Sequence, residues 1–479
     1  MNFRQYSNLE HVIIPEHVKI NNSQQMFYNM KNLQTATILS DTTSLYVAFY
    51  NCNKLQSVNI NYNKTTNMAS IYSGCVNLQG SPVCGDSVQN MSSSYSSCSK
   101  LTGSPVCGPS VTNMSYTYYN CKQLTGSPVC GPSVTNMRGT YKGCSNLTGS
   151  PVCGDNVTYM EGTYGGCSNL IGSPVCGDKV QVMTDTYFDC HKLTGSPVCG
   201  PNVIYMGGAY QNCYNLTGAP ACGDNVTSMY EYYTTYPIGG YWRSAYANCF
   251  NLTGAPVCGK NVTDMRYAYF RCNNLTGSPA CGDNVRMMSD AYSGCSNLTG
   301  IPVCGPNVDH MDGTYKDCYN LTGSPACGEM VTVFQSTYVN CYNLTGSPVC
   351  GNNVRGMQNA YRNCYNLTGA PVCGVSVQYM DNTYANCYNL VGNAYFYSDN
   401  VSNMANCFYG RSNETALHIY VNANTTSANT ISINNANSMI GSAFTWATDR
   451  ATGTPYISGH NIYVHKVANV HNARIANGD

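Results

Sequence analysis

The chain has 479 residues, only 10% of them charged, and its 23 Lys and Arg residues balance 23 Asp and Glu residues. Such sparse and balanced charge excludes a basic face that could hold a phosphate backbone, so no nucleic-acid partner is predicted. No apolar run reaches the roughly 18 to 20 residues of a membrane-spanning helix, so no membrane insertion is predicted. The first twenty residues lack the apolar core of a secretory signal.

Residues 1–56 contain weak copies of a unit that later becomes regular. Met30 stands at the position of a recurring cysteine, and Phe27 and Phe49 stand where later units have tyrosine. The end of a repeat stack needs a cap, because each coil buries its apolar face only against its neighbours. These degenerate coils therefore predict an N-terminal cap.

Residues 57–392 repeat with a period of 23. The first of two cysteine series keeps this interval from Cys52 to Cys213 and resumes it at Cys249, after one gap of 36. The second series follows nine residues behind the first. A fixed period of this length is typical of solenoids, propellers and repeat arrays, and 23 residues are too few for a propeller blade or a helix pair. We therefore predict a repeat solenoid of about 17 coils, counted on a recurring leucine.

Each unit has two halves of different character. Val134, Met137, Tyr141, Cys144 and Leu147 are three or four residues apart, which places them on one face of a helical or 3-10 stretch. The octapeptide LTGSPVCG, by contrast, is short and bracketed by glycine, which is typical of a brief extended segment and a turn. The predicted fold class is leucine-rich-repeat-like, with one short parallel strand of two to four residues, placed in the octapeptide, and one short helical turn per coil. The proline in each octapeptide argues against a longer strand.

One unit is 13 residues longer than the others, and the extra length lies between Met229 and Ser244, in an insertion at 230–243. An insertion in one repeat of a solenoid maps to a loop, often on the binding face, and aromatic residues are enriched at contact sites. We hypothesise a contact site here; the alternative is a tolerated insertion that folds back on the stack. The aromatic residues of the insertion are Tyr230, Tyr232, Tyr233, Tyr236, Tyr241 and Trp242.

The tyrosines outside the insertion fall into two classes. Those in the apolar stripe, such as Tyr118 and Tyr141, are predicted to be half-buried core rings with their hydroxyls at the rim. Five others follow the first-series cysteine directly and lie off the stripe, so they are predicted to form an exposed row that stacks on sugars or binds a protein surface. The alternative for these five is simple surface packing. They are Tyr214, Tyr319, Tyr342, Tyr365 and Tyr388.

The 29 cysteines leave three interpretations open. Reduced side chains would fill a narrow core at every coil. Disulfides between the two series would require an oxidising compartment, and zinc is disfavoured because the chain has no CxxC pair. No nucleophile triad, phosphate loop or dinucleotide fingerprint occurs, and the recurring acids, such as Asp155 and Asp178, support a carbohydrate-cleaving pair only weakly. We predict no catalytic residue, no metal site and no cofactor.

Residues 393–479 break the period and are predicted to form a C-terminal cap or attachment module. The segments LHIYVNAN and HNIYVHKV have a strand-like pattern, and VANVHNARIANGD is predicted to form a final helix.

The string Val134-Thr-Asn-Met137, followed by Tyr141, Cys144 and Leu147, resembles the VTNM…MF..C..L signature of BspA-like leucine-rich repeats. It is most similar to the Met-containing subtype of bacterial surface proteins. This sequence has tyrosine where that family usually has phenylalanine, and LTGSPVCG replaces the usual L..I.IP strand. The resemblance implies extracellular or surface recognition, commonly adhesion, and brings no catalytic residues. Related repeats also occur in bacteriophage tail proteins.

These observations predict a non-enzymatic recognition or adhesion protein whose partner is a host or cell-surface protein or glycan. A phage tail or receptor-binding component, part of a virion or of a homo-oligomer, fits the missing secretion signal. The alternatives are a bacterial or protozoan surface adhesin and a purely structural spacer.

Overall fold

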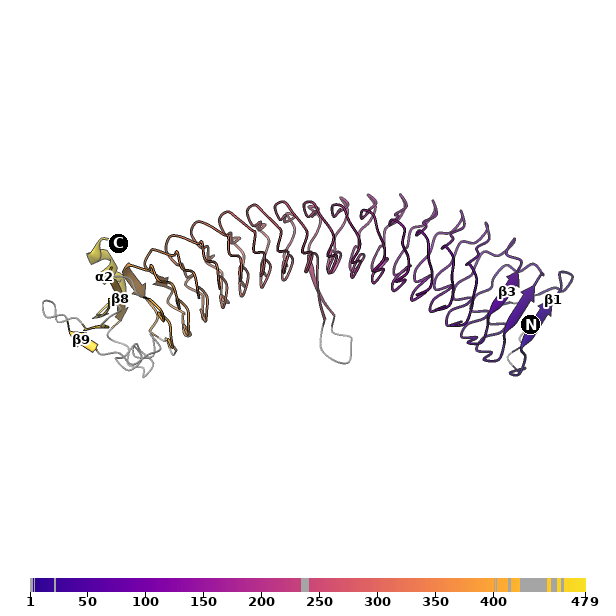
Figure 1. Cartoon of the computed structure of the whole chain (residues 1–479), viewed down its shortest axis with the longest axis horizontal. Helices are drawn as coiled ribbons and strands as arrows, with labels where there is room; N and C mark the ends of the chain where they lie inside the picture. Colours follow the sequence, from indigo (N-terminus) through magenta and orange to yellow (C-terminus); the bar gives the residue numbers. More distant parts are fainter. Residues whose placement is uncertain are drawn as a thin grey trace. The chain divides into compact units, whose positions relative to one another are not determined.

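The computed structural model describes residues 3, 5–20, 23–233, 241–399, 401, 403–411, 415–422, 446–448, 455–457 and 461–479. The chain divides into two compact units, Met1–Leu252 and Thr253–Asp479. Each unit is a stack of similar coils, drawn mostly as loop in Figure 1. The predicted leucine-rich-repeat-like solenoid is confirmed.

In the first unit, true parallel strands occur in the first coils. β1 (His11–Ile14), β2 (Thr35–Ile38) and β3 (Ser57–Ile60) pair in parallel in that order. Each strand begins two residues after the recurring leucine of its coil, where later coils carry the octapeptide.

The regular coils pair differently from the sequence-based expectation. No strand forms in the described octapeptides before β6 (Val372–Cys373), and parallel pairing contracts to single bridges, such as that between Asn113 and Asn136. The bridges lie in the VTN segment instead. The expected octapeptide strand is thus wrong for these coils, because a proline at the same level of every coil donates nothing to a ladder.

The expected helical turn is a run of tight turns. The N–H groups of Thr140 and Cys144 donate to carbonyls three residues earlier, at 3.0 and 2.9 Å, whereas the N–H of Tyr141 donates to the Thr163 carbonyl of the next coil at 2.8 Å. This alternation uses left-handed residues, such as Gly139 with φ 60°, which interrupt a continuous helix. The turns therefore bind neighbouring coils together as a sheet would.

The core holds the five predicted positions of each coil. Val134, Met137, Tyr141, Cys144 and Leu147 are all 0% exposed. Rings of successive coils stack, as Tyr141 does against the preceding tyrosine at 5.6 Å and 7°. The stripe tyrosines are thus fully buried rather than half-buried.

The hydroxyl of each core tyrosine holds the octapeptide that precedes it. The Tyr141 hydroxyl donates to the Val129 carbonyl oxygen at 2.7 Å and accepts from the Val129 N–H at 3.0 Å. Both backbone groups of Val129 are therefore satisfied without a partner strand. The same pair of bonds recurs from Tyr95 to Tyr246 in the first unit and from Tyr269 to Tyr361 in the second.

Phenylalanine occupies this ring position beside three of the true strands, whereas Tyr72 follows β3 and Tyr384 follows β6. Phe27 follows β1, Phe49 follows β2, and Phe408 follows β7 (Gly392–Phe396). Ladder hydrogen bonds already satisfy those strands, so no hydroxyl is required. In the coils whose octapeptide forms no strand, the tyrosine hydroxyl thus takes the place of the ladder hydrogen bonds.

The cysteines pack in two distinct ways. The first series is buried, and the Cys144 Sγ donates to the Tyr118 carbonyl oxygen at 2.9 Å. The second series is mostly half-buried, and the Cys130 Sγ lies where a Cβ on Gly154 of the next coil would come within 3.0 Å of it. The glycine of most CysGly pairs thus leaves space for a sulfur atom of the preceding coil. All 29 cysteines are free, as in the core-filling interpretation.

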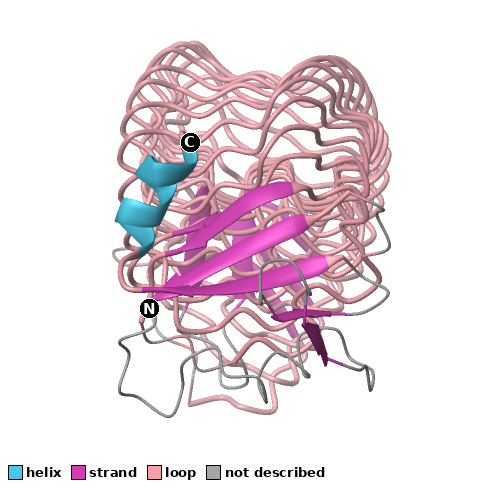
Figure 2. Cartoon of the chain, turned by 90° about the vertical axis from the view of Figure 1, so that its left-hand side faces the viewer, coloured by secondary structure: helices cyan, strands magenta, loops and turns pink. Residues whose placement is uncertain are grey.

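The second unit ends in a six-stranded sheet that includes β8 (Leu417–Asn422), β9 (Trp446–Thr448), β10 (Pro455–Ile457) and β11 (Ile462–Val467). The strand order is β6-β7-β8-β11-β10-β9. The first four strands in this order pair in parallel, whereas β10 pairs in antiparallel fashion with both β11 and β9. Helix α2 (Val470–Asn477) contacts β7 and β8 (Figure 2). The two predicted strands and the final helix are confirmed.

The stack continues one coil beyond Leu390, where the sequence period ends. The N–H of Met380 donates to the Asn403 carbonyl at 2.7 Å, as between regular coils. Arg411 takes the first-series cysteine position of this coil, since its N–H donates to the Phe408 carbonyl three residues earlier. Its Nε donates to the Leu390 carbonyl at 2.9 Å, and burial lowers the pKa of Arg411 to about 10.

Tyr141→Phe tests the hydroxyl contact. We expect this change to lower the free energy of unfolding by about 1 to 3 kcal/mol, because two backbone groups of Val129 lose their partner. Urea denaturation measures the loss, and hydrogen exchange at the Val129 amide locates it. Tyr365→Phe is the control, because the Tyr365 hydroxyl makes no hydrogen bond within the described residues. Equal effects of the two changes would contradict this account.

Alkaline pH should unfold the protein. Burial raises the pKa of Cys107 to about 11 and that of Cys121 to about 12, from an ordinary value of 9.0. The unfolded chain therefore loses these protons first, so stability is intact below about pH 9 and falls as pH rises toward 12. Urea midpoints from pH 7 to 11, with recovery at pH 7 as the control, check this. A constant midpoint throughout would refute it.

Candidate functional site

A row of four stacked tyrosines lies on the surface of the second unit. Tyr319, Tyr342, Tyr365 and Tyr388 directly follow the first-series cysteines of successive coils. Their ring centroids are 5.0, 5.0 and 5.3 Å apart, with interplanar angles of 4°, 1° and 9°. The end rings are each 38% exposed and the inner rings half-buried. The expected aromatic row is present, and its role in binding stays a prediction.

Stacking determines which parts of the rings a partner can reach. Each inner ring is covered on both faces, so it presents an edge and a hydroxyl rather than a face for a sugar. Tyr319 differs, because the preceding coil has the small Ser296 at the corresponding position. Burial raises the pKa of Tyr319, and the negative charge of Asp317 adds to this rise. The same two causes raise the pKa of Tyr342. The hydroxyls of Tyr319 and Tyr342 are therefore protonated donors at neutral pH.

A ladder of side-chain amides accompanies the tyrosine row. Asn340 donates to Asp317 at 2.5 Å, Asn363 donates to Asn340 at 2.7 Å, and Asn386 donates to Asn363 at 2.7 Å. These residues have φ between 62° and 65°, a left-handed conformation that Asn and Asp tolerate well. Each asparagine precedes a row tyrosine by two positions, so the ladder fixes the backbone that carries the row.

The first unit carries a shorter version of the same arrangement. Tyr214 stacks on His191 at 4.7 Å and on Phe250 at 5.3 Å. Sequence reasoning missed His191 and Phe250, although both directly follow a first-series cysteine, as Tyr214 does. The accompanying amide ladder runs through Asp189, Asn212 and Asn248.

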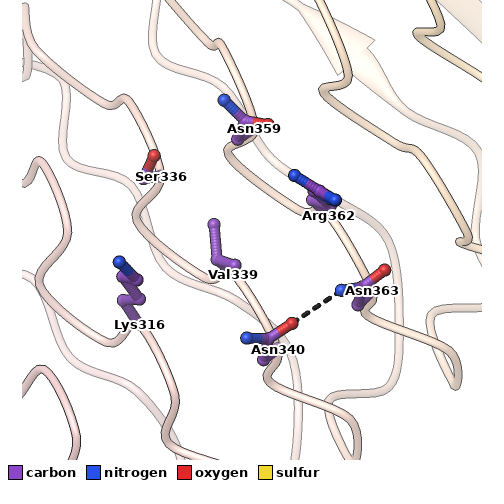
Figure 3. A pocket seen from close by; sticks show the side chains of 7 residues that line it. All are labelled: Lys316, Ser336, Val339, Asn340, Asn359, Arg362 and Asn363. Carbon is purple, nitrogen blue, oxygen red and sulfur yellow. Dashed lines mark hydrogen bonds between the residues drawn. The ribbon is translucent and has the colours of Figure 1, made fainter.

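A cavity of about 360 Å³ adjoins the ladder of the second unit. Lys316, Val339 and Arg362 occupy the same position of three successive coils, and Figure 3 shows Val339 between the two cations. A short side chain between two long ones leaves the hollow. Sequence reasoning missed this site, whose signal is two basic residues 46 positions apart on the 23-residue period. The lining residues are Lys316, Ser336, Val339, Asn340, Asn359, Arg362 and Asn363.

A second cavity of about 450 Å³ lies on the column of single bridges. Gly356 stands in this column between Val333 and Tyr379, and the side-chain ends of Gln335 and Gln358 occupy the space that a Cβ of Gly356 would need. Tyr379 is 43% exposed, and Tyr159 and Tyr205 of the first unit's column are 47% and 50% exposed. Sequence reasoning singled out none of these three rings, because most residues of their column are not aromatic.

The insertion forms a hairpin in the first unit. β4 (Tyr230–Tyr233) and β5 (Tyr241–Ser244) pair in antiparallel register, and their strands extend away from the neighbouring coils (Figure 1). Tyr230 is only 9% exposed, so it packs at the base, whereas Trp242 is half-buried. Tyr232, Tyr233 and Tyr241 lie in the strands, and Tyr236 lies outside the described residues.

Charge anchors the base of this hairpin. The Arg243 Nε lies 3.0 Å from Asp185 Oδ1, and its guanidinium carbon lies 4.1 Å from the centre of the Phe188 ring. Burial raises the pKa of Asp185, and the Arg243 charge opposes this rise. The insertion is therefore fixed to the stack at its root.

The described residues contain no group of three or more His, Cys, Asp or Glu side chains arranged to hold a metal ion. No helix in the described part of the chain has the length and apolar character needed to cross a membrane.

A family model described as "BspA type Leucine rich repeat region (6 copies)" matches residues 1–125 and 265–391, more than half of the chain. A comparison with curated proteins found no match. Among solved structures, a leucine-rich repeat protein from Bacteroides ovatus is 13% identical, with 86% of this chain and 87% of that chain covered and a TM-score of 0.41. A leucine rich cell surface protein from Faecalibacterium prausnitzii is 17% identical, with 81% and 88% covered and a TM-score of 0.27. The family match shows that this chain belongs to the BspA type leucine-rich repeat family.

Proposed function

We propose that this protein is a non-enzymatic recognition or adhesion protein that contacts a protein or glycan on a host or cell surface. The observation that carries the proposal is the exposed row of four stacked tyrosines in the second unit. Repeats of this family typically occur in extracellular or surface proteins and are typically non-catalytic, which suggests recognition or adhesion.

The chemistry of the row suits a contact surface. Tyrosine supplies a large area and a hydrogen-bonding group with few rotatable bonds. Stacking restricts the rings before any partner binds, so less side-chain entropy is lost when the complex forms. The neighbouring Asn340 and Asn363 add uncharged amide groups. This combination favours binding to hydroxyl-rich or peptide surfaces.

The hairpin supplies a second proposed contact. Its base is held by Asp185 and Arg243, while its strands extend from the coils. A rigid root beneath an aromatic extension is suited to reaching a partner. The aromatic residues of the insertion other than the buried Tyr230 are the candidates.

The setting that we propose is a bacteriophage tail or receptor-binding component, and the alternative is a bacterial or protozoan surface adhesin. The 29 free thiols support the first setting. First-series cysteines donate hydrogen bonds as thiols, as Cys144 does, so the fold suits a compartment that keeps thiols reduced. Detection of the chain in purified virions would test this setting, and an oxidised, exported form would contradict it.

A purely structural spacer is the competing function, and the near-identity of the coils favours it. A spacer needs the buried stripe but no surface aromatic row. The two functions therefore differ in what removal of the row would do.

Tyr319→Ala combined with Tyr342→Ala tests the row. We expect at least about tenfold weaker adsorption of the full chain to bacterial cells, because interface tyrosines contribute strongly to binding. Adsorption of labelled protein to a panel of strains measures the effect. Tyr159→Ala, which removes a 47% exposed tyrosine elsewhere, is the control. Unchanged adsorption by a folded double variant would favour the spacer.

Trp242→Ala and Tyr241→Ala test the hairpin separately. We expect weaker adsorption with an unchanged unfolding midpoint, because the root contacts of Asp185 and Arg243 remain. The same cell assay, with circular dichroism to verify the fold, measures both quantities. Wild-type adsorption by both variants would eliminate the hairpin as a contact.

A further inference from the structure

We infer that the cavity beside the amide ladder binds an anionic sugar whose carboxylate or phosphate lies between Lys316 and Arg362. The inference deepens the proposed function and rests on it for the source of the ligand. Its own basis is the charge, hydrogen-bonding capacity and size of the cavity in Figure 3.

Arg362 provides the strongest indication that the cavity binds an anion. Elsewhere in the second unit, Arg266 lies 2.7 Å from a carboxylate oxygen of Asp264, and Arg286 lies 3.5 Å from one of Asp309. The Arg362 guanidinium is exposed, and within the described residues it makes no ion pair or side-chain hydrogen bond. A planar guanidinium of this kind binds carboxylate or phosphate in two-pronged geometry.

Lys316 places a second positive charge across Val339 from Arg362. The two residues are two coils apart, which corresponds to about 10 Å at the usual spacing of about 4.8 Å between paired strands. The acids of this region have other partners: Asp317 accepts from Asn340, and Asp290 accepts from a serine and a tyrosine hydroxyl. Lys316 attracts the Asp290 carboxylate, so Arg362 is the principal anion contact and Lys316 the supporting one.

Neutral donors surround the charged groups. The Ser336 hydroxyl and the Asn359 amide line the cavity and make no side-chain hydrogen bond within the described residues. Such groups bind sugar hydroxyls, which a bare inorganic anion lacks. The volume of about 360 Å³ lies within the range of ligand pockets, roughly 300 to 1,000 Å³. An acidic sugar uses both the cations and the neutral donors.

The tyrosine row gives such a ligand a continuation. Asn340 and Asn363 line the cavity, and Tyr342 and Tyr365 follow them by two residues. A saccharide with its acidic unit in the cavity therefore has tyrosine hydroxyls available on the same coils. The cavity selects the charge, and the row adds contact area.

Calorimetric titration of the full chain tests the inference. The ligands are a glucuronate-containing oligosaccharide, its carboxyl-reduced neutral counterpart and a phosphorylated oligosaccharide. We expect the wild-type chain to prefer an acidic ligand over the neutral one by about tenfold, as for a charge-assisted contact. The preference should weaken with added salt. The ligand that binds more tightly, carboxylate or phosphate, identifies the anion, and either supports the inference.

Arg362→Gln and Lys316→Gln should each reduce this preference, the first more strongly. Arg355→Gln removes an exposed arginine from the other cavity of the same unit and should leave the preference intact. Equal binding of acidic and neutral ligands by the wild-type chain, or loss of preference in Arg355→Gln alone, would overturn the inference. Cell adsorption that survives Arg362→Gln but not loss of the tyrosine row, combined with no acidic preference, would overturn this site and retain the proposed function.

Discussion

The structure depends on how each coil satisfies its backbone groups without a continuous sheet. In the regular coils, one buried tyrosine hydroxyl satisfies both backbone groups of the valine or alanine that follows the octapeptide proline, as Tyr141 does for Val129. Buried peptide groups without partners are costly, so this contact permits a proline-containing segment in the wall of every coil. Where true strands occur, as at β1 and β2, phenylalanine suffices at the ring position.

Contacts between coils also determine which residue types occur at the fixed positions of the repeat. Glycine follows the second-series cysteine because the sulfur of the preceding coil occupies its Cβ space, as at Gly154. Asparagine occurs beside the tyrosine row because it combines positive φ with an amide that bonds from coil to coil, as in Asn340 and Asn363. Near-identity of the coils thus has a physical cause: each residue faces its own copy. Function must then be sought where a column changes its residue.

Sequence reasoning predicted what depends on periodicity. The buried stripe, exemplified by Met137 and Leu147, and the position of the row tyrosines follow from spacing alone. It placed the strand wrongly because a hydroxyl twelve residues away, rather than a neighbouring strand, holds the octapeptide. It missed the cavity because Lys316 and Arg362 come together only when three coils are stacked. The hairpin was located from its length, but its buried root at Tyr230 was not foreseen.

Arg411 has a consequence for how such a gene can change. It replaces the recurring cysteine in the last coil, and its side chain donates to the Leu390 carbonyl, a group on the coil before it. The terminal sheet therefore requires one preceding coil of standard geometry, whatever the number of coils before that. Duplication or deletion of whole 23-residue units would alter the number of coils while leaving this junction intact. Recombination can therefore change the number of coils in steps of one without disturbing the terminal sheet.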